Sequence, residues 1–242
     1  MKIINAFWEL RNLGVSSSEI TIELSDTIDD LKAILFSFKG PEYIVFKVPS
    51  GGVEFLKCLT DNGFYFVETL SEMQLDITDY NIPEKLARFD KNLTYKILPS
   101  EDLDSLGYEI KKGIFNTDRI AMDSNFGKDI AANRYFNWIK DEVLKGNNIY
   151  EILYKEEPIG FFGLKQIGDR SFDNFLAGLY IEKSNFGFGF STITKSIEEI
   201  KIRNGKYLIT HVSSNNISIY RLYIQLGFMV NNHSYCMTKL FH

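Results

Sequence analysis

Hydrophobic and polar positions alternate with two different periods along this chain, and the periods predict its elements. Apolar residues that recur every three or four positions predict helices over 128–145, 190–205 and 215–227. Extended apolar runs predict strands over 94–98, 149–155, 158–167, 172–182 and 206–212. Short polar breaks containing Gly or Pro favour antiparallel hairpins among the middle three strands. We therefore expect an α+β fold, with a mixed sheet flanked by helices rather than a doubly wound sheet.

One stretch of this pattern occurs twice. Residues 55–77 (FLKCLTDNGFYFVETLSEMQLDI) align without a gap with residues 219–241 (IYRLYIQLGFMVNNHSYCMTKLF). In each copy a helical pattern ends at a glycine, Gly63 or Gly227, which is typical of a left-handed helix cap. The residues after each glycine are predicted to form a strand, a turn and a second strand. The match indicates two related half-structures.

The polar stretch 78–95 separates the two copies and contains Pro83, so it is predicted to be a linker or a short connecting helix. We expect two units, a smaller one over residues 1–92 and a larger one over residues 93–242.

A glycine-containing loop, SNFGFGF over 184–190, joins a predicted strand to a predicted helix. The free backbone N–H groups and the dipole at a helix start suit an anionic phosphate group. Gly187 and Gly189 would allow close approach of a ligand, although such a pair also occurs in simple tight turns. The loop is neither a dinucleotide fingerprint, which needs a third glycine, nor a Walker A loop, which needs Lys followed by Ser or Thr.

Residues 94–242 resemble the GCN5-related N-acetyltransferase (GNAT) superfamily. That family's phosphate loop reads Gln/Arg-x-x-Gly-x-Gly/Ala, and here it reads S184-N-F-G187-F-G189. Ser184 in place of Gln or Arg removes one side-chain contact. The family also has an asparagine at the start of the last helix and a tyrosine seven residues later, which Asn216 and Tyr223 match.

This resemblance implies a GNAT fold, preceded by a truncated GNAT-like unit. It also implies acetyl-CoA as the co-substrate, direct attack by a primary amine, and no metal. The residues that it assigns to acetyl-CoA are Leu179, Tyr180 and Ile181 through their backbone, then Phe186, Gly187, Phe188, Gly189, Phe190 and Ser191, and finally Asn216 and Tyr223. Asn216 has a second interpretation as a simple helix N-cap, and both roles are compatible.

Tyr223 is the predicted catalytic residue. A hydroxyl near the sulfur can protonate the leaving thiolate, and general acid catalysis of this kind contributes roughly 10²–10⁴-fold. The alternative is that the ring only packs on the helix face. The upstream copy has Leu59 at the same position, so the position accepts an apolar side chain.

The segment 115–143 starts with Phe-x-x-Asp-Arg, contains Asp123 and Phe126, and continues with Arg-Tyr-x-x-Trp-Ile before an acidic helix end. In these features it resembles bacterial TDP-fucosamine acetyltransferases, which implies an acceptor amine on a nucleotide-linked deoxyamino sugar. Acetylation of a protein, a peptide or another small amine stays open, as does a non-catalytic module that binds acyl-CoA. Asp118 and Arg119 could contact the sugar or its diphosphate, or could form a surface pair. His211 could relay a proton, or could be a buried core residue of its strand.

The composition of the chain limits the kinds of partner that it is expected to bind. The 242 residues are 45% hydrophobic and carry a net charge of −5, which argues against sequence-independent nucleic-acid binding. Cys58 and Cys236 lack metal-ligand spacing and are predicted to be buried free thiols. We find no signal peptide and no apolar run of the ~20 residues that cross a bilayer, so we expect a cytoplasmic protein without a membrane partner. A homodimer is left open.

Overall fold

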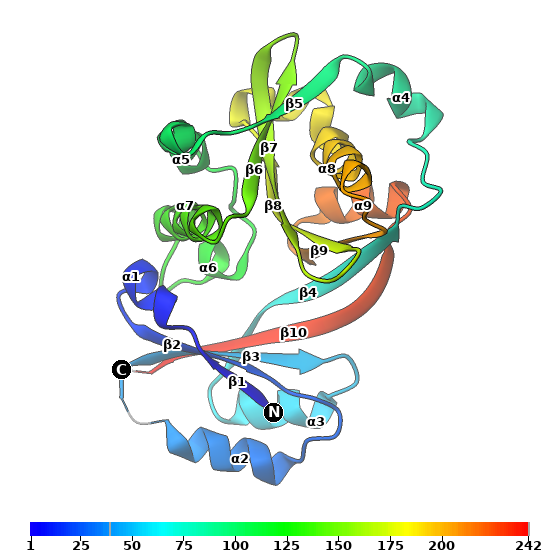
Figure 1. The fold of residues 1–242 in the computed structure, drawn as a ribbon. Helices are drawn as coiled ribbons and strands as arrows, with labels where there is room; N and C mark the ends of the chain where they lie inside the picture. The colour runs from blue at the N-terminus through cyan, green and yellow to red at the C-terminus, as the bar shows by residue number, and fades with distance from the viewer. Residues whose placement is uncertain (39, 242) are drawn as a thin grey trace.

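The computed structural model describes residues 1–38 and 40–241, which form one ten-stranded mixed sheet flanked by helices (Figure 1). The strand order is β1-β2-β3-β10-β4-β9-β8-β7-β6-β5. The strands are β1 (Lys2–Asn5), β2 (Ser16–Thr21), β3 (Glu42–Pro49), β4 (Tyr65–Asp76), β5 (Leu93–Ile97), β6 (Asn148–Tyr154), β7 (Glu157–Gln166), β8 (Ser171–Leu179), β9 (Tyr207–Ser213) and β10 (Met229–Phe241).

The α-helices are α1 (Leu10–Leu13), α2 (Ile28–Ser37), α3 (Val53–Asp61), α4 (Glu84–Asp90), α5 (Leu103–Lys111), α6 (Arg119–Met122), α7 (Lys128–Leu144), α8 (Ser191–Ile202) and α9 (Ile217–Gln225). Short 3₁₀ helices are η1 (Phe7–Glu9), η2 (Ser100–Asp102), η3 (Ile181–Phe186) and η4 (Phe188–Phe190). In the described part of the chain, no helix combines the length and the apolar character needed to cross a membrane.

The predicted elements between 94 and 227 are confirmed within a few residues, and so is the predicted α+β mixed sheet. Alternation along the strands sends side chains to two cores. Ile149 and Phe161 pack with α5 and α7 on one face, whereas Tyr150 and Phe162 pack with α8 on the other (Figure 1). The larger unit is therefore a three-layer arrangement of helix, sheet and helix.

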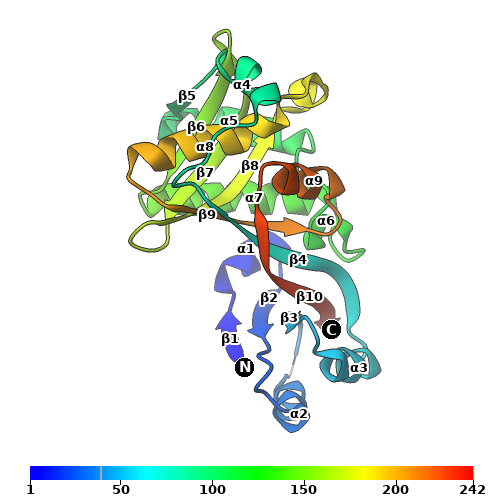
Figure 2. The same cartoon turned by 90° about the vertical axis from the view of Figure 1, so that its right-hand side faces the viewer.

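The last strands of the two repeated copies are exchanged. β4, from residues 1–92, pairs with β9, while β10 pairs with β3. β4 and β10 also pair with each other, and Figure 2 shows both strands running from one half of the molecule to the other. Neither of the two predicted units closes its sheet with its own residues alone. We call residues 1–92 the first half and residues 93–242 the second half.

The register of the exchanged pairs follows the sequence repeat. Leu70 pairs with Ser213, and the two residues at the equivalent positions of the other copy, Ser234 and Pro49, also pair. The offset that aligns 55–77 with 219–241 therefore relates β3 to β9 and β4 to β10 throughout. The two halves are arranged about an approximate two-fold axis, as expected for related half-structures.

The predicted glycine caps are confirmed, because Gly63 and Gly227 have φ of 80° and 89°. The prediction of a turn inside each following segment is wrong. β4 and β10 are continuous strands, and their pairing absorbs two irregularities as bulges, with Asn231 the extra residue in β10 and Val67 the extra residue in β4. Both strands have a neighbour on each side, and this pairing keeps the backbone extended where the polar residues alone suggested a turn.

Both cysteines are free thiols, as predicted. Cys236 is buried in β10, and burial raises the pKa of its thiol to about 12. Cys58 is only half-buried, so its predicted burial is wrong.

Candidate active site

β8 and β9 are parallel neighbours that separate after three residue pairs, from Ser171↔Tyr207 to Asp173↔Ile209. The register of β8 with β7 shifts at the same place, where Phe175 is the extra residue of a β-bulge. A bulge bends its strand and increases the local twist, which explains why the pairing with β9 ends there. The equivalent strands of the first half, β2 and β3, stay paired from Ser16↔Glu42 to Thr21↔Lys47. The second half therefore has a gap between two strands that the first half lacks.

Tyr223 lies at the start of this gap. Its hydroxyl is 3.5 Å from Oγ1 of Thr210, the first residue of β9 beyond the paired stretch. Thr210 Oγ1 in turn donates to the backbone carbonyl of Asn174 at 3.2 Å. The ring of Tyr223 stacks on Phe228 with 5.0 Å between centroids. The side chain of Tyr223 therefore both packs against Phe228 and makes a polar contact at the gap. Burial raises the pKa of Tyr223, so its hydroxyl stays protonated at neutral pH.

Two buried polar atoms, one beside the gap and one at the N-terminus of α8, have no hydrogen-bond partner among the described residues. They are Oδ1 of Asn174 in β8 and Oγ of Ser191, the first residue of α8. The amide nitrogen of Asn174 donates to the carbonyl of Thr192 and to Oγ of Ser196, which fixes the side chain against α8. Buried polar groups are normally paired. Oδ1 of Asn174 is therefore free to bind a donor group of a ligand that lies along the gap.

The predicted phosphate loop lies between β8 and α8 and folds as η3 and η4. Gly187 joins the two turns with a φ of 77°, a conformation that favours glycine. A Cβ atom at Gly187 would meet nothing within 4 Å, and one at Gly189 would approach only Cδ2 of Leu222 at 3.8 Å. Space is therefore open in front of both glycines. In the described structure no side chain caps the first turn of α8, although the N–H of Ser191 already donates to the carbonyl of Phe188 in η4.

The three aromatic residues of this loop have different surroundings. Phe190 is buried, Phe186 is exposed, and Phe188 packs on Tyr154 with 4.8 Å between ring centroids. Ser184 donates to the carbonyl of Ile181 and so closes the η3 turn. Phe188 and Phe190 therefore anchor the loop to the core, and Phe186 stays at its surface.

Leu179, Tyr180 and Ile181, which were predicted to contact acetyl-CoA through their backbone, differ from one another in the partners of their backbone groups. The strand ends at Leu179 rather than at 182, and Ile181 begins η3. The N–H of Tyr180 donates to the carbonyl of Ile159 in β7 at 2.9 Å, and its carbonyl accepts from the N–H of Lys183. Both backbone polar groups of Tyr180 are therefore already paired, so its predicted backbone contact with acetyl-CoA has no support in this structure. Because backbone groups alternate along an antiparallel pair, the amide of Leu179 points to the β9 side.

Asn216 is the N-cap of α9. Its Oδ1 accepts from the N–H of Ile219 at 3.3 Å, which confirms the capping interpretation. Its predicted contact with acetyl-CoA stays a prediction.

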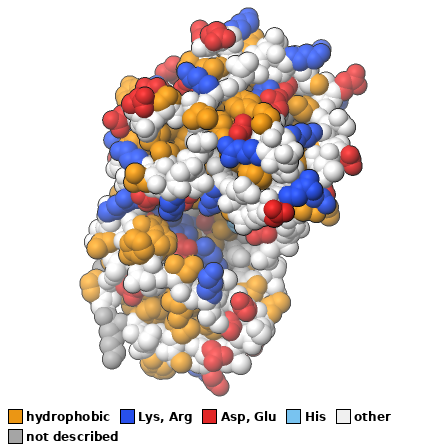
Figure 3. All heavy atoms as spheres, viewed as in Figure 1, with side chains coloured by type: hydrophobic (Ala, Val, Ile, Leu, Met, Phe, Trp, Pro, Cys, Tyr) orange, Lys and Arg blue, Asp and Glu red, His pale blue; other side chains and the backbone are white. Residues whose placement is uncertain are grey.

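A cavity of about 1170 Å³ lies between the two halves, against the sheet face that carries α6 and α7. Figure 3 shows the surface hollowed where the halves meet, with charged side chains around the hollow. The residues that line it are Phe7, Trp8, Glu9, Leu10, Arg11, Asn12, Glu19, Lys47, Glu68, Leu70, Glu72, Asp118, Arg119, Arg134, Tyr135, Trp138, Asp141, Glu142, Leu144, Lys145, Lys165, Asp173, Phe175, Leu176, His211, Ser213, Asn232 and Ser234.

Asp118 and Arg119 line this cavity, so their interpretation as a solvated surface pair is wrong. Asp118 caps α6 by accepting from the N–H of Ala121 at 2.9 Å. Arg119 is buried and binds the carboxylate of Glu19, which also accepts from Lys47 at 2.9 Å. Burial opposes ionisation of Glu19, but the charges of Arg119 and Lys47 prevail and hold its pKa well below the usual range. These residues form an ion-pair network inside the cavity wall.

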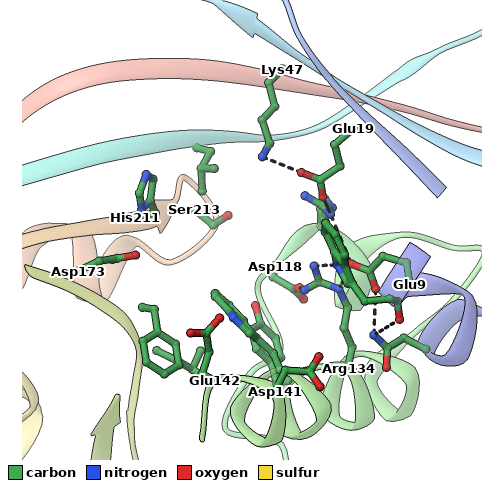
Figure 4. A pocket seen from close by; sticks show the side chains of 18 of the residues that line it. Glu9, Glu19, Lys47, Asp118, Arg134, Asp141, Glu142, Asp173, His211 and Ser213 are labelled. Atoms are coloured by element: carbon green, nitrogen blue, oxygen red, sulfur yellow. Dashed lines mark hydrogen bonds and ion pairs between the residues drawn. The ribbon is translucent and has the colours of Figure 1, made fainter. Parts of the chain in front are cut away.

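Asp173 and His211 lie on the cavity side of the gap (Figure 4). One oxygen of Asp173 is 3.3 Å from Nζ of Lys165, and the other has no partner among the described residues. Burial raises the pKa of Asp173, and Lys165 offsets only part of this effect. The side chain of His211 is 44% exposed, with Nε2 3.6 Å from Glu72. His211 is therefore a cavity residue, and its interpretation as a buried core histidine is wrong.

Glu68 is a second buried carboxyl group in the cavity. It is 4% exposed, its Oε2 has no partner among the described residues, and burial raises its pKa. Neither Glu68 nor Asp173 is among the site residues predicted from the sequence. The signal for Asp173 was present, because it is a lone charge inside an otherwise apolar strand pattern, FDNFLAGLY. Glu68 had no comparable signal in its mixed segment.

No protein-family model and no curated protein matches this chain. Solved structures do match it. A GCN5-related N-acetyltransferase from Sphaerobacter thermophilus superposes with a TM-score of 0.65 at 11% identity, over 99% of this chain and 75% of that one. One from Kribbella flavida gives 0.55 at 14% identity, over 93% and 81%. A tandem GNAT protein from the clavulanic acid biosynthesis pathway gives 0.56 at 11%, over 94% and 76%. The chain therefore has the GNAT fold in a two-half arrangement.

Proposed function

We propose that this chain is an N-acetyltransferase that moves the acetyl group of acetyl-CoA to a primary amine. The observation that carries the proposal is the gap between β8 and β9, with the hydroxyl of Tyr223 at its start. A loop suited to phosphate lies at one end of β8, and a large cavity lies on the opposite face of the sheet from Tyr223. The GNAT fold supports the same conclusion.

The residues along the gap would hold acetyl-CoA, which supplies a thioester carbonyl open to attack by an amine. The turn at Gly187 and Gly189 and the N-terminus of α8 would bind its pyrophosphate. The unpaired atoms of Asn174 and Ser191 and the amide of Leu179 would bind the amide groups of its arm. A backbone N–H beside the gap would also stabilise negative charge on the carbonyl oxygen.

Two proton transfers are needed, one at each side of the gap. Tyr223 donates a proton toward the leaving sulfur, since its raised pKa keeps the donor form populated. The attacking amine must lose a proton on the cavity side, where Asp173 and His211 lie. Because burial raises the pKa of Asp173, its carboxylate is a stronger base than an exposed aspartate.

A nucleotide-linked amino sugar is the acceptor suggested by the sequence resemblance over 115–143. That segment supplies Asp118, Arg119 and Arg134 to the cavity wall, but both arginines already pair with carboxylates of this chain, so they offer no free cation to a diphosphate. Cytoplasmic acetyl-CoA would supply the acetyl group.

The proposal is tested by thiol release from acetyl-CoA in the presence of a panel of primary amines that includes a TDP-linked 4-amino sugar, a peptide N-terminus and simple aliphatic amines. We expect at least one amine to release coenzyme A at a rate that depends on enzyme concentration. Calorimetric titration with acetyl-CoA distinguishes acetyl transfer from the main alternative, which is binding of acyl-CoA without catalysis. Tight binding of acetyl-CoA without thiol release for any amine would indicate a non-catalytic acyl-CoA-binding module.

A further inference from the structure

We infer that the amine acceptor carries at least two positive charges, with its reacting nitrogen beside Asp173 and His211 and a second ammonium group on Glu68. This inference rests on the proposed acetyl transfer and adds the class of acceptor. The acceptor class follows from which charged groups in the cavity already have partners.

The positive charges that line the cavity are all neutralised by the protein itself. Each of its Lys and Arg side chains has a carboxylate of this chain within 4.0 Å. Arg119 has an Nε atom without a partner among the described residues, but its guanidinium is bound by Glu19 and lies 3.9 Å from Glu9. An acceptor with a diphosphate would have to displace these carboxylates, which makes an anionic acceptor unfavourable.

The unused hydrogen-bonding capacity of the cavity lies on its carboxyl groups. Eight of them line it, against six Lys and Arg side chains. Oε2 of Glu68 and Oδ1 of Asp173 have no partner in the described structure, and the two residues are only 4% and 8% exposed. A buried carboxyl oxygen without a donor is costly, and an ammonium group provides both a donor and the opposite charge. Both groups are therefore placed to accept a cation.

The spacing of these carboxyl groups along the cavity favours an elongated acceptor molecule. Glu68 and Glu72 project from the same face of β4, and four residues of a strand span about 13 Å. His211 and Ser213 lie beside them on β9, because Glu72 pairs with His211 and Leu70 with Ser213. Glu72 approaches His211 at 3.6 Å, so this end of the row adjoins the gap. A linear diamine or triamine can place one nitrogen at the gap while another reaches Glu68.

The test compares bis(3-aminopropyl)amine, a linear triamine, with butylamine and with a TDP-linked 4-amino sugar. Thiol release from acetyl-CoA gives kcat/KM for each, and calorimetry gives the affinity of the protein for the triamine without acetyl-CoA. A charge-assisted hydrogen bond at Glu68 predicts a kcat/KM for the triamine about ten- to a hundredfold above that for butylamine. Glu68→Gln should remove most of this advantage while changing the butylamine rate little.

The matched control is Asp141→Asn, which also removes a cavity carboxylate, but one already held by Arg11. It should leave the triamine preference intact. The inference is overturned if butylamine or the nucleotide sugar is used as well as the triamine by the unaltered protein, a comparison that needs no variant to fold. It is also overturned if Glu68→Gln and Asp141→Asn behave alike. Triamine binding that depends on Glu68, without thiol release from any amine, supports the cationic site and refutes acetyl transfer.

Discussion

The hydroxyl of Tyr223 lies 3.5 Å from the hydroxyl of Thr210, at the place where β8 and β9 separate. The equivalent positions in the first half hold Leu59 and Phe46, which are both fully buried. The first half thus has hydrocarbon where the second half has two hydroxyl groups, and its strands β2 and β3 do not separate. Within this one chain, the half that has the two hydroxyl groups also has the gap between its strands, and the half that lacks them lacks the gap.

Replacing Tyr223 with Phe should lower kcat about ten- to a thousandfold, which corresponds to about 1.4–4 kcal/mol of transition-state stabilisation. The ring and its stacking on Phe228 are kept, so the Michaelis constant for acetyl-CoA should change little. Steady-state kinetics with an amine that is turned over measures both constants. Tyr220→Phe, on the same helix, is the control and should keep full activity. A Tyr223→Phe enzyme within about twofold of the unaltered one would leave the hydroxyl only a packing role.

Replacing Gly187 with Ala should weaken acetyl-CoA binding by about tenfold, or about 1.4 kcal/mol. The new methyl group enters the open space where the phosphates are proposed to bind. It also strains a backbone with φ of 77°, at a stability cost of about 1 kcal/mol. Gly146→Ala isolates the strain, because Gly146 has φ of 86° and equal space but lies at the end of α7. Calorimetric titration and thermal unfolding of both variants measure the two effects. Equal acetyl-CoA affinity in the two variants would refute the phosphate-loop assignment.

The chain should bind one acetyl-CoA, although it contains two related halves. In the first half β2 and β3 stay paired through Thr21↔Lys47, so no gap is open to an acyl-CoA arm. Leu59 also occupies the place of the proposed proton donor. Calorimetric titration should give a stoichiometry near one per chain, and Gly187→Ala should weaken that single event. A second binding event that this substitution leaves unchanged would place a site in the first half.

Glu68→Gln should stabilise the protein at pH 8 and have little effect on stability near pH 4. Burial raises the pKa of Glu68 above its value in the unfolded chain. The folded state therefore favours the protonated form, and stability is lost as pH rises through the folded pKa. Gln remains neutral, so the variant avoids this loss. Thermal unfolding at the two pH values tests the sign, and a variant less stable than the unaltered chain at pH 8 would contradict it. Together with its predicted loss of triamine affinity, this result would mark Glu68 as a residue that lowers stability in exchange for binding.

Local pattern was sufficient for the elements of the second half and for the glycine loop. Strands such as 149–155 are continuous apolar runs between breaks, and helices such as 128–145 show a clear period of three to four residues. The cap at Gly227 was also predictable, because a left-handed conformation favours glycine whatever surrounds it.

The arrangement of distant segments could not be read in this way. The exchange of β4 and β10 depends on pairing between Leu70 and Ser213 and between Ser234 and Pro49, and no local pattern specifies such partners. The environment of His211 was misjudged for the same reason. Most of β9 around it is apolar (Leu208, Ile209 and Val212), which suggested burial, but the sheet face on which His211 lies borders the cavity and not a packed helix.

The exchanged strands also set the order in which the molecule can be completed during synthesis. When residues 1–92 have left the ribosome, the edge of β3 that β10 later covers is still exposed, and β4 has no partner on either side. Exposed strand edges favour aggregation, and pairings distant in sequence form slowly. The first half cannot finish folding until residues 229–241 have been translated. Nascent chains stalled before that segment should therefore depend on chaperones that shield strand edges, however well their local elements form.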